Sequence, residues 1–134
     1  MTDEELIAGF ENCTLANESF HHVDHVRTAF LYLCRYPALE ALQRFSSALA
    51  RFAAAHGKPH LYNETVTWAF LLLIHERMVR AGCEQTWPQF AASNPDLLQW
   101  KSSILKQYYR DETLRSDLAK HTFLLPDKSI PAPG

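Results

Sequence analysis

Apolar side chains three and four residues apart recur along most of the chain, and this spacing places them on one face of an α-helix. The stretches that carry it predict four long helices, over residues 3–13, 22–36, 37–56 and 64–81. Thr2 and Glu5 have the spacing of a capping box at the first of these helices. Gly57 and Gly82 stand where the third and fourth are expected to stop.

The stretch from Trp68 to Ile74 is apolar all round its helix, which is typical of a helix enclosed by its neighbours. Shorter helices are expected over residues 87–93, 95–109 and 113–120, and no stretch has the alternating pattern of a strand. These patterns predict an all-α fold, a single-domain helical bundle of about five to six helices with a buried central helix. We expect the domain to span residues 1–125 and a proline-rich tail to cover 126–134.

The composition is that of an ordinary globular domain. Of 134 residues, 47% are apolar and 21% charged, which is enough to build a core without disulfides. The net charge is −2 and the basic residues are scattered, so we expect neither nucleic acid nor membrane as a partner. No apolar run is long enough to span a bilayer and no secretion signal opens the chain, so a cytoplasmic location is expected.

The segment over residues 20–26 gathers three histidines and an aspartate at the expected start of the second helix. At helical spacing, His22 and His25 lie about 60° apart within the apolar stripe. His21 and Asp24 project toward the sides. Two inward histidines at this spacing can bind one metal ion, but they can equally be a hydrogen-bonded pair at a helix start.

A carboxylate from another helix would favour the metal site. Glu64 lies in the first turn of the predicted central helix, on the face that also holds Trp68. The helix dipole alone also favours an acidic residue at this position. If the starts of the second and fourth helices meet, His22, His25 and Glu64 supply two imidazoles and one carboxylate, a donor set of non-haem iron and some zinc sites.

Five further residues are candidates for this site. Glu11, near the end of the first helix, could be another ligand or the catalytic general base. Additional ligands, or contacts that orient the ligands, could come from His21, His60, Tyr62 and Asn63. The chain has no glycine-rich phosphate loop, GxSxG motif or HExxH motif, so enzymes that depend on those motifs are poorly supported.

The same residues bear a resemblance to a family. The chain resembles small bacterial proteins, without an assigned reaction, that share Phe-Glu-x-x-Thr-Leu, Phe-x-His-x-x-His-[Leu/Val]-Arg and Tyr-x-Glu-Thr-x-Thr. The matching segments are residues 10–15, 20–27 and 62–67, and the likeness extends to residues 125–127. The resemblance implies a joint site formed by Glu11, His22, His25 and Glu64. That family often has a histidine where this chain has Asn63, which His60 or His21 would then have to replace.

These features predict a small metal-dependent enzyme that acts on a small organic molecule. Two imidazoles and a carboxylate favour iron over copper, manganese or zinc, and a non-haem oxidoreductase over a zinc- or manganese-dependent hydrolase or lyase. The competing interpretation is a non-enzymatic helical module that binds a small molecule or a partner. An apolar face on the third helix or near Trp87 could also form a homodimer.

Overall fold

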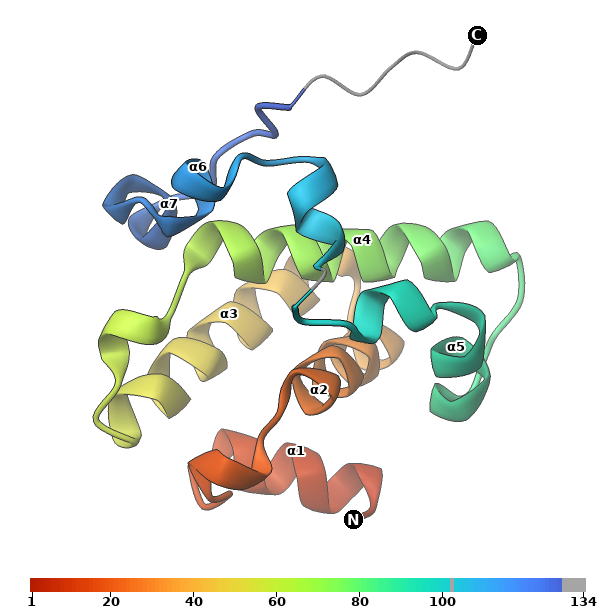
Figure 1. Ribbon diagram of the computed structural model, residues 1–134. Coiled ribbons are helices and arrows are strands. Elements are labelled where there is room, and N and C mark those ends of the chain that lie inside the picture. Colours follow the sequence, from red (N-terminus) through yellow and green to blue (C-terminus); the bar gives the residue numbers. More distant parts are fainter. Residues whose placement is uncertain (102, 129–134) are drawn as a thin grey trace, which may run out of the picture.

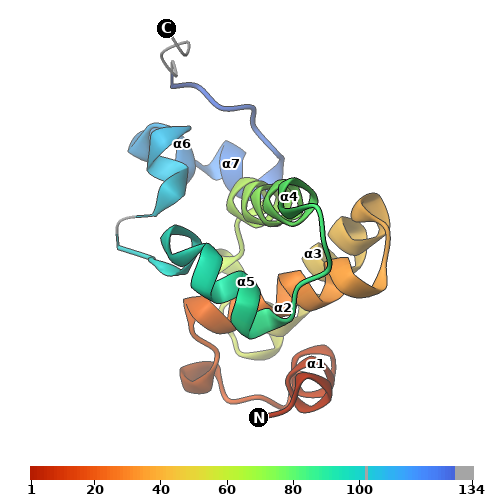
Figure 2. The ribbon, with the colours of Figure 1, turned by 90° about the vertical axis from the view of Figure 1, so that its right-hand side faces the viewer.

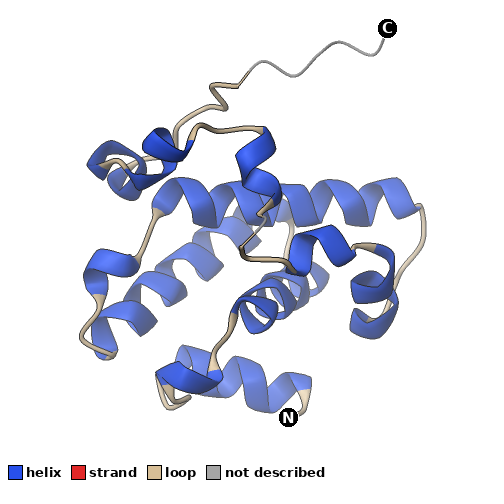
Figure 3. Ribbon diagram, in the orientation of Figure 1, coloured by secondary structure: helices blue, strands red, loops and turns tan. Residues whose placement is uncertain are grey.

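The computed structural model describes residues 1–101 and 103–128. Within those residues it contains helices and loops and no strand (Figure 3), which confirms the all-α prediction. The α-helices are α1 Asp3–Glu11, α2 His22–Arg35, α3 Ala38–Ala55, α4 Glu64–Ala81, α5 Trp87–Ser93, α6 Asp111–Arg115 and α7 Asp117–His121. The short 3₁₀ helices between them are η1 Asn17–Ser19, η2 Pro59–Leu61, η3 Pro95–Leu98 and η4 Ile104–Gln107.

Helix α4 is the central element of the bundle. It crosses α2 and α3 on one side and contacts α7 on the other, and α1 packs against α2 and α3 on the side away from α4 (Figures 1 and 2). Leu71 and Ile74 of α4 are fully buried, whereas Leu72 is 38% exposed. The predicted central helix is therefore enclosed on most faces and keeps one strip open to solvent.

The ends of the long helices lie where the sequence predicts them, to within two residues. Thr2 and Glu5 form the predicted capping box at α1, in which each side chain accepts a hydrogen bond from the other's backbone N–H. Asn63 caps α4 by accepting from the Val66 N–H at 3.0 Å. Gly82 ends α4 in the left-handed conformation, with φ of +70°, which glycine adopts at little cost.

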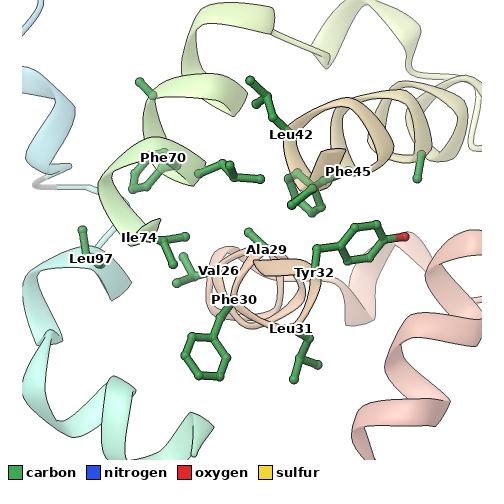
Figure 4. Close-up of a cluster of buried hydrophobic side chains, with 14 of the residues drawn as sticks. Val26, Ala29, Phe30, Leu31, Tyr32, Leu42, Phe45, Phe70, Ile74 and Leu97 are labelled. Atoms are coloured by element: carbon green, nitrogen blue, oxygen red, sulfur yellow. The ribbon is translucent and has the colours of Figure 1, made fainter. Parts of the chain in front are cut away.

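Helix α2 is enclosed more completely than its apolar stripe predicts. Every residue from Thr28 to Tyr32 is buried, because α2 contacts α1, α3, α4, α5 and η3. Figure 4 shows α2 in the core: Val26 and Ala29 lie near Phe45 of α3 and Ile74 of α4. The wall that carries the predicted histidine pair is thus fixed from several sides.

The single helix expected over residues 95–109 is wrong. The segment forms η3 and η4 instead, and the described residues between them, 99–101 and 103, are not helical. Leu97 and Leu105 are both buried, so the apolar spacing of a helix is present although the backbone is interrupted. Ser103 supports the interruption because its hydroxyl accepts from the Leu105 N–H and starts η4.

The helix expected over residues 113–120 is two helices, because Ser116 ends α6 and caps α7 by accepting from the Ala119 N–H. Residues 126–128 of the predicted tail run over the body, where the N–H groups of Asp127 and Lys128 donate to the Tyr108 carbonyl. The remainder of that tail, 129–134, lies outside the described residues. Across the described chain, no helix combines the length and apolar character that crossing a membrane requires.

Candidate functional site

A cavity of about 850 Å³ lies among α2, α3 and α4. Its walls are mainly apolar, and the side chains that form them include Val26, Ala29, Phe45, Phe52, Phe70 and Ile74. Several of these appear in Figure 4, between the ribbons of the three helices. The volume is within the range of small-molecule sites, which are typically apolar with a few polar groups.

The predicted histidine pair supplies polar groups on the α2 wall. His22 and His25 both line the cavity. Their orientation follows from the start of the helix, where the Asp24 carboxylate accepts from the His21 N–H at 2.9 Å and fixes the first turn. His21 itself is exposed at the N-cap position and does not line the cavity.

The His22 ring is held by a backbone group on another element. Its Nε2 lies 2.9 Å from the Leu97 carbonyl oxygen at the end of η3. Because a carbonyl only accepts, Nε2 carries the hydrogen, and Nδ1 keeps its lone pair while the ring is neutral. Burial lowers the pKa of His22, and the hydrogen bond to Leu97 partly opposes that shift. The Trp100 ring lies 5.1 Å from the His22 ring, centroid to centroid.

His25 is the more strongly perturbed of the two. Burial, reinforced by the nearby His22, lowers the pKa of His25 to about 4. Its ring lies 4.2 Å from that of Phe20. Both imidazoles are therefore neutral near pH 7, and this end of the cavity is polar without being charged.

Glu64 does not line the cavity. Its Oε1 accepts hydrogen bonds from the Tyr62 hydroxyl at 2.5 Å and from the Trp68 indole N–H at 2.9 Å. Burial and the Glu64 carboxylate raise the pKa of Tyr62, so its hydroxyl keeps the proton that it donates. Tyr62 does line the cavity and so links it to Glu64.

The described residues do not bring the full predicted ligand set together. Among residues 1–101 and 103–128, no three His, Cys, Asp or Glu side chains are placed to hold one metal ion. Asn63 lines the cavity, whereas His60 is exposed on η2 and does not. The His22, His25 and Glu64 metal site stays a prediction.

Glu11 belongs to a different part of the surface. It lines an open groove of about 690 Å³ with Tyr32, Tyr36 and Arg51, among others. Burial and the neighbouring Glu11 raise the pKa of Tyr32. Glu11 is absent from the lining of the cavity that contains the histidines, so the structure separates it from them.

Sequence reasoning missed three features of this site. The Leu97 carbonyl is a backbone group, and nothing in the sequence marks it as a histidine partner. Trp100 lies in the interruption between η3 and η4, which was expected to be helical. Basic side chains that are scattered in the sequence, Lys58, Lys101, Lys106, Arg115 and Lys120, also line the cavity.

Comparisons with protein-family models, with curated proteins and with solved structures find no match to this chain. The resemblance to the small bacterial family therefore stays a prediction, and the function has to be inferred from the cavity itself.

Proposed function

We propose that this protein binds a small, largely apolar organic molecule in the cavity among α2, α3 and α4. The observation that supports this most directly is an apolar space of about 850 Å³ with two neutral imidazoles on one wall. Known ligand sites have this character, in which apolar walls provide affinity and a few polar groups fix orientation.

The cavity is open to solvent on one side, because Leu61 and Trp100 of its lining are exposed. Its apolar walls therefore keep apolar surface in contact with water. A ligand that fills the space removes that surface from water and gains dispersion contacts with the walls, and both effects favour binding.

The two histidines are suited to recognise an uncharged polar group on such a ligand. Nε2 of His22 is occupied by the Leu97 carbonyl, so Nδ1 is the nitrogen of this ring that can accept. The neutral His25 ring offers one donor and one acceptor. A hydroxyl or carbonyl group on the ligand fits these groups without placing a charge inside the apolar cavity.

The test is binding of N-phenyl-1-naphthylamine, a neutral apolar dye that becomes fluorescent in apolar sites. We expect saturable binding to the wild-type protein and its loss in Ala53→Phe, because Ala53 lines the cavity. Ala54→Phe is the matched control, since Ala54 is exposed on the same helix and outside the lining. Binding that is absent, or equal in the two variants, would contradict the proposal.

As a second candidate, we propose that His22 and His25 bind a divalent metal, iron first, for chemistry on the bound molecule. The hydrogen bond from His22 to the Leu97 carbonyl favours it, because metal-ligating histidines usually donate their other ring N–H to such a group. Neutral imidazoles are also the form that binds metals. The remaining ligands would come from water or substrate, and the Glu64 carboxylate is the predicted third protein ligand. Zinc or manganese would supply hydrolytic or lyase chemistry instead.

Metal analysis distinguishes this candidate from simple binding. Purified protein reconstituted with iron should hold one equivalent, and His25→Ala should lose it. His60→Ala should keep the metal, because His60 is exposed outside the cavity. Substoichiometric metal in the wild-type protein, unchanged by His25→Ala and unimproved by reconstitution, would rule the metal site out.

A further inference from the structure

The outer part of the cavity carries a concentration of positive charge. Five basic side chains line it against a single acidic one, Asp111. Asp111 pairs with Arg115, with 3.4 Å between the nearest nitrogen and oxygen. The four lysines, Lys58, Lys101, Lys106 and Lys120, form no ion pair with another described residue. The net charge at this opening is therefore positive on a chain whose formal net charge is −2.

The lysines come from separate segments of the chain. Lys58 precedes η2, Lys101 lies between η3 and η4, Lys106 is in η4 and Lys120 is in α7. Lys58, Lys101 and Lys106 are exposed and Lys120 is partly so, which marks the solvent-facing part of the lining. Two large apolar side chains of the lining, Trp100 and Leu61, are also 59% and 63% exposed.

From the lysines at the opening and the apolar walls among the helices, we infer that the ligand is a single-chain anionic amphiphile. Its apolar body lies among α2, α3 and α4, and its anionic head group lies among the lysines. This inference rests on the proposed function, since it names the ligand class of the same cavity. Like-signed charges around an opening raise the local concentration of the opposite ion.

The buried part of the lining excludes the reverse orientation. Burying an anion beside apolar walls is costly unless a positive group pairs with it. Val26, Phe45, Phe70 and Ile74 are buried there and carry no charge, whereas the lysines belong to the solvent-facing part of the lining. An anionic head group is therefore stabilised at the opening, and the aromatic and aliphatic walls suit the chain.

Displacement of N-phenyl-1-naphthylamine by ligands with one chain length and different head groups tests the inference. Decanoate and decyl sulfate should displace the dye at lower concentration than 1-decanol, and decylamine should be the weakest competitor. Added salt should reduce the advantage of the anions, because exposed charges are screened within about 10 Å at 0.1 M.

Lysine variants locate the head group. The affinity for decanoate should fall by about two- to fivefold, the range for exposed ion pairs, in each of Lys58→Gln, Lys101→Gln and Lys120→Gln. The binding of 1-decanol should not change. Arg35→Gln removes the same charge from an exposed position outside the lining and is the control.

The outcomes separate this inference from the proposed function. If dye and 1-decanol bind but decanoate has no advantage, the cavity binds apolar molecules and the anionic head group is wrong. If the anionic preference is the same in the lysine variants and in Arg35→Gln, the assignment to the opening is also wrong. If the dye does not bind at all, the proposed function itself fails.

Discussion

Individual residues in the cavity are tuned by burial more than by charged neighbours. His25 is the clearest example, because removal from water lowers its pKa to about 4. The carboxylate of the adjacent Asp24 opposes that shift only weakly. A histidine that stays neutral in the folded protein but is protonated when the chain unfolds makes stability depend on pH. The direction of that dependence follows from the sign of the shift.

We predict that acid destabilises the protein partly through His25. The unfolded chain takes up a proton below pH 6.5, whereas the folded protein resists it down to about pH 4. The contribution of His25 to the free energy of unfolding then stays constant above pH 6.5 and falls between pH 6.5 and pH 4. The total loss from this group is on the order of 3 kcal/mol. Urea unfolding of metal-free wild-type protein and His25→Gln between pH 7 and pH 4 measures the difference.

His60→Gln is the control for that experiment, since His60 is exposed on η2. Its stability should follow the wild-type dependence on pH, because this variant keeps His25 in its buried place. Carboxylates contribute equally to all three proteins, so only the difference between variants reports on His25. Parallel curves for the wild-type protein and His25→Gln would show that His25 is not held neutral by the fold.

At the scale of elements, the sequence predicts helices well where both ends carry a signal. Asn63 and Gly82 bracket α4, and Thr86 starts α5 with a capping box. Prediction fails over 95–109, because the buried Leu97 and Leu105 keep helical spacing across a backbone that is not helical. Periodicity reports which side of a segment faces the core, and two short turns packed on one core can reproduce the pattern of a continuous helix.

Periodicity also explains why the position of the histidines in the site could be predicted and the orientation of Glu64 could not. Helical phase placed His22 and His25 on the inner side of α2, and both line the cavity. Which way Glu64 turns depends on Tyr62 and Trp68, whose hydrogen bonds hold its carboxylate outside the lining. Each such hydrogen bond changes the free energy of one side-chain orientation by about 1 kcal/mol, and the spacing of residues in the sequence does not predict it.

At the scale of the whole molecule, the fold gathers charges that the sequence disperses. Lys58 and Lys120 are far apart along the chain yet line one cavity, so a scan for basic runs finds nothing. The C-terminal segment is essential to this arrangement, because α6 and α7 bring Arg115 and Lys120 to the opening. What holds that segment against the bundle therefore also shapes the site.

One buried hydroxyl on α4 holds the C-terminal segment in place. Thr65 is fully buried, donates to the Thr122 carbonyl at 2.8 Å and accepts from the Leu124 N–H at 3.1 Å. Valine has nearly the same shape but removes both bonds, which leaves the Thr122 carbonyl and the Leu124 N–H without the partner that ties their segment to α4. We predict that Thr65→Val lowers the free energy of unfolding by about 1–3 kcal/mol, measured by urea denaturation.

Thr28→Val is the matched control for this last prediction, because Thr28 is equally buried but its hydroxyl bonds to Asp24 O within its own helix. That carbonyl keeps its helical partner when the hydroxyl is lost, so the change should be close to neutral. Thr65→Val should also lower the affinity for decanoate more than the affinity for 1-decanol, since a loosened α7 moves Lys120 away from the opening. Equal stability losses in the two variants would mean that Thr65 packs against the segment without anchoring it.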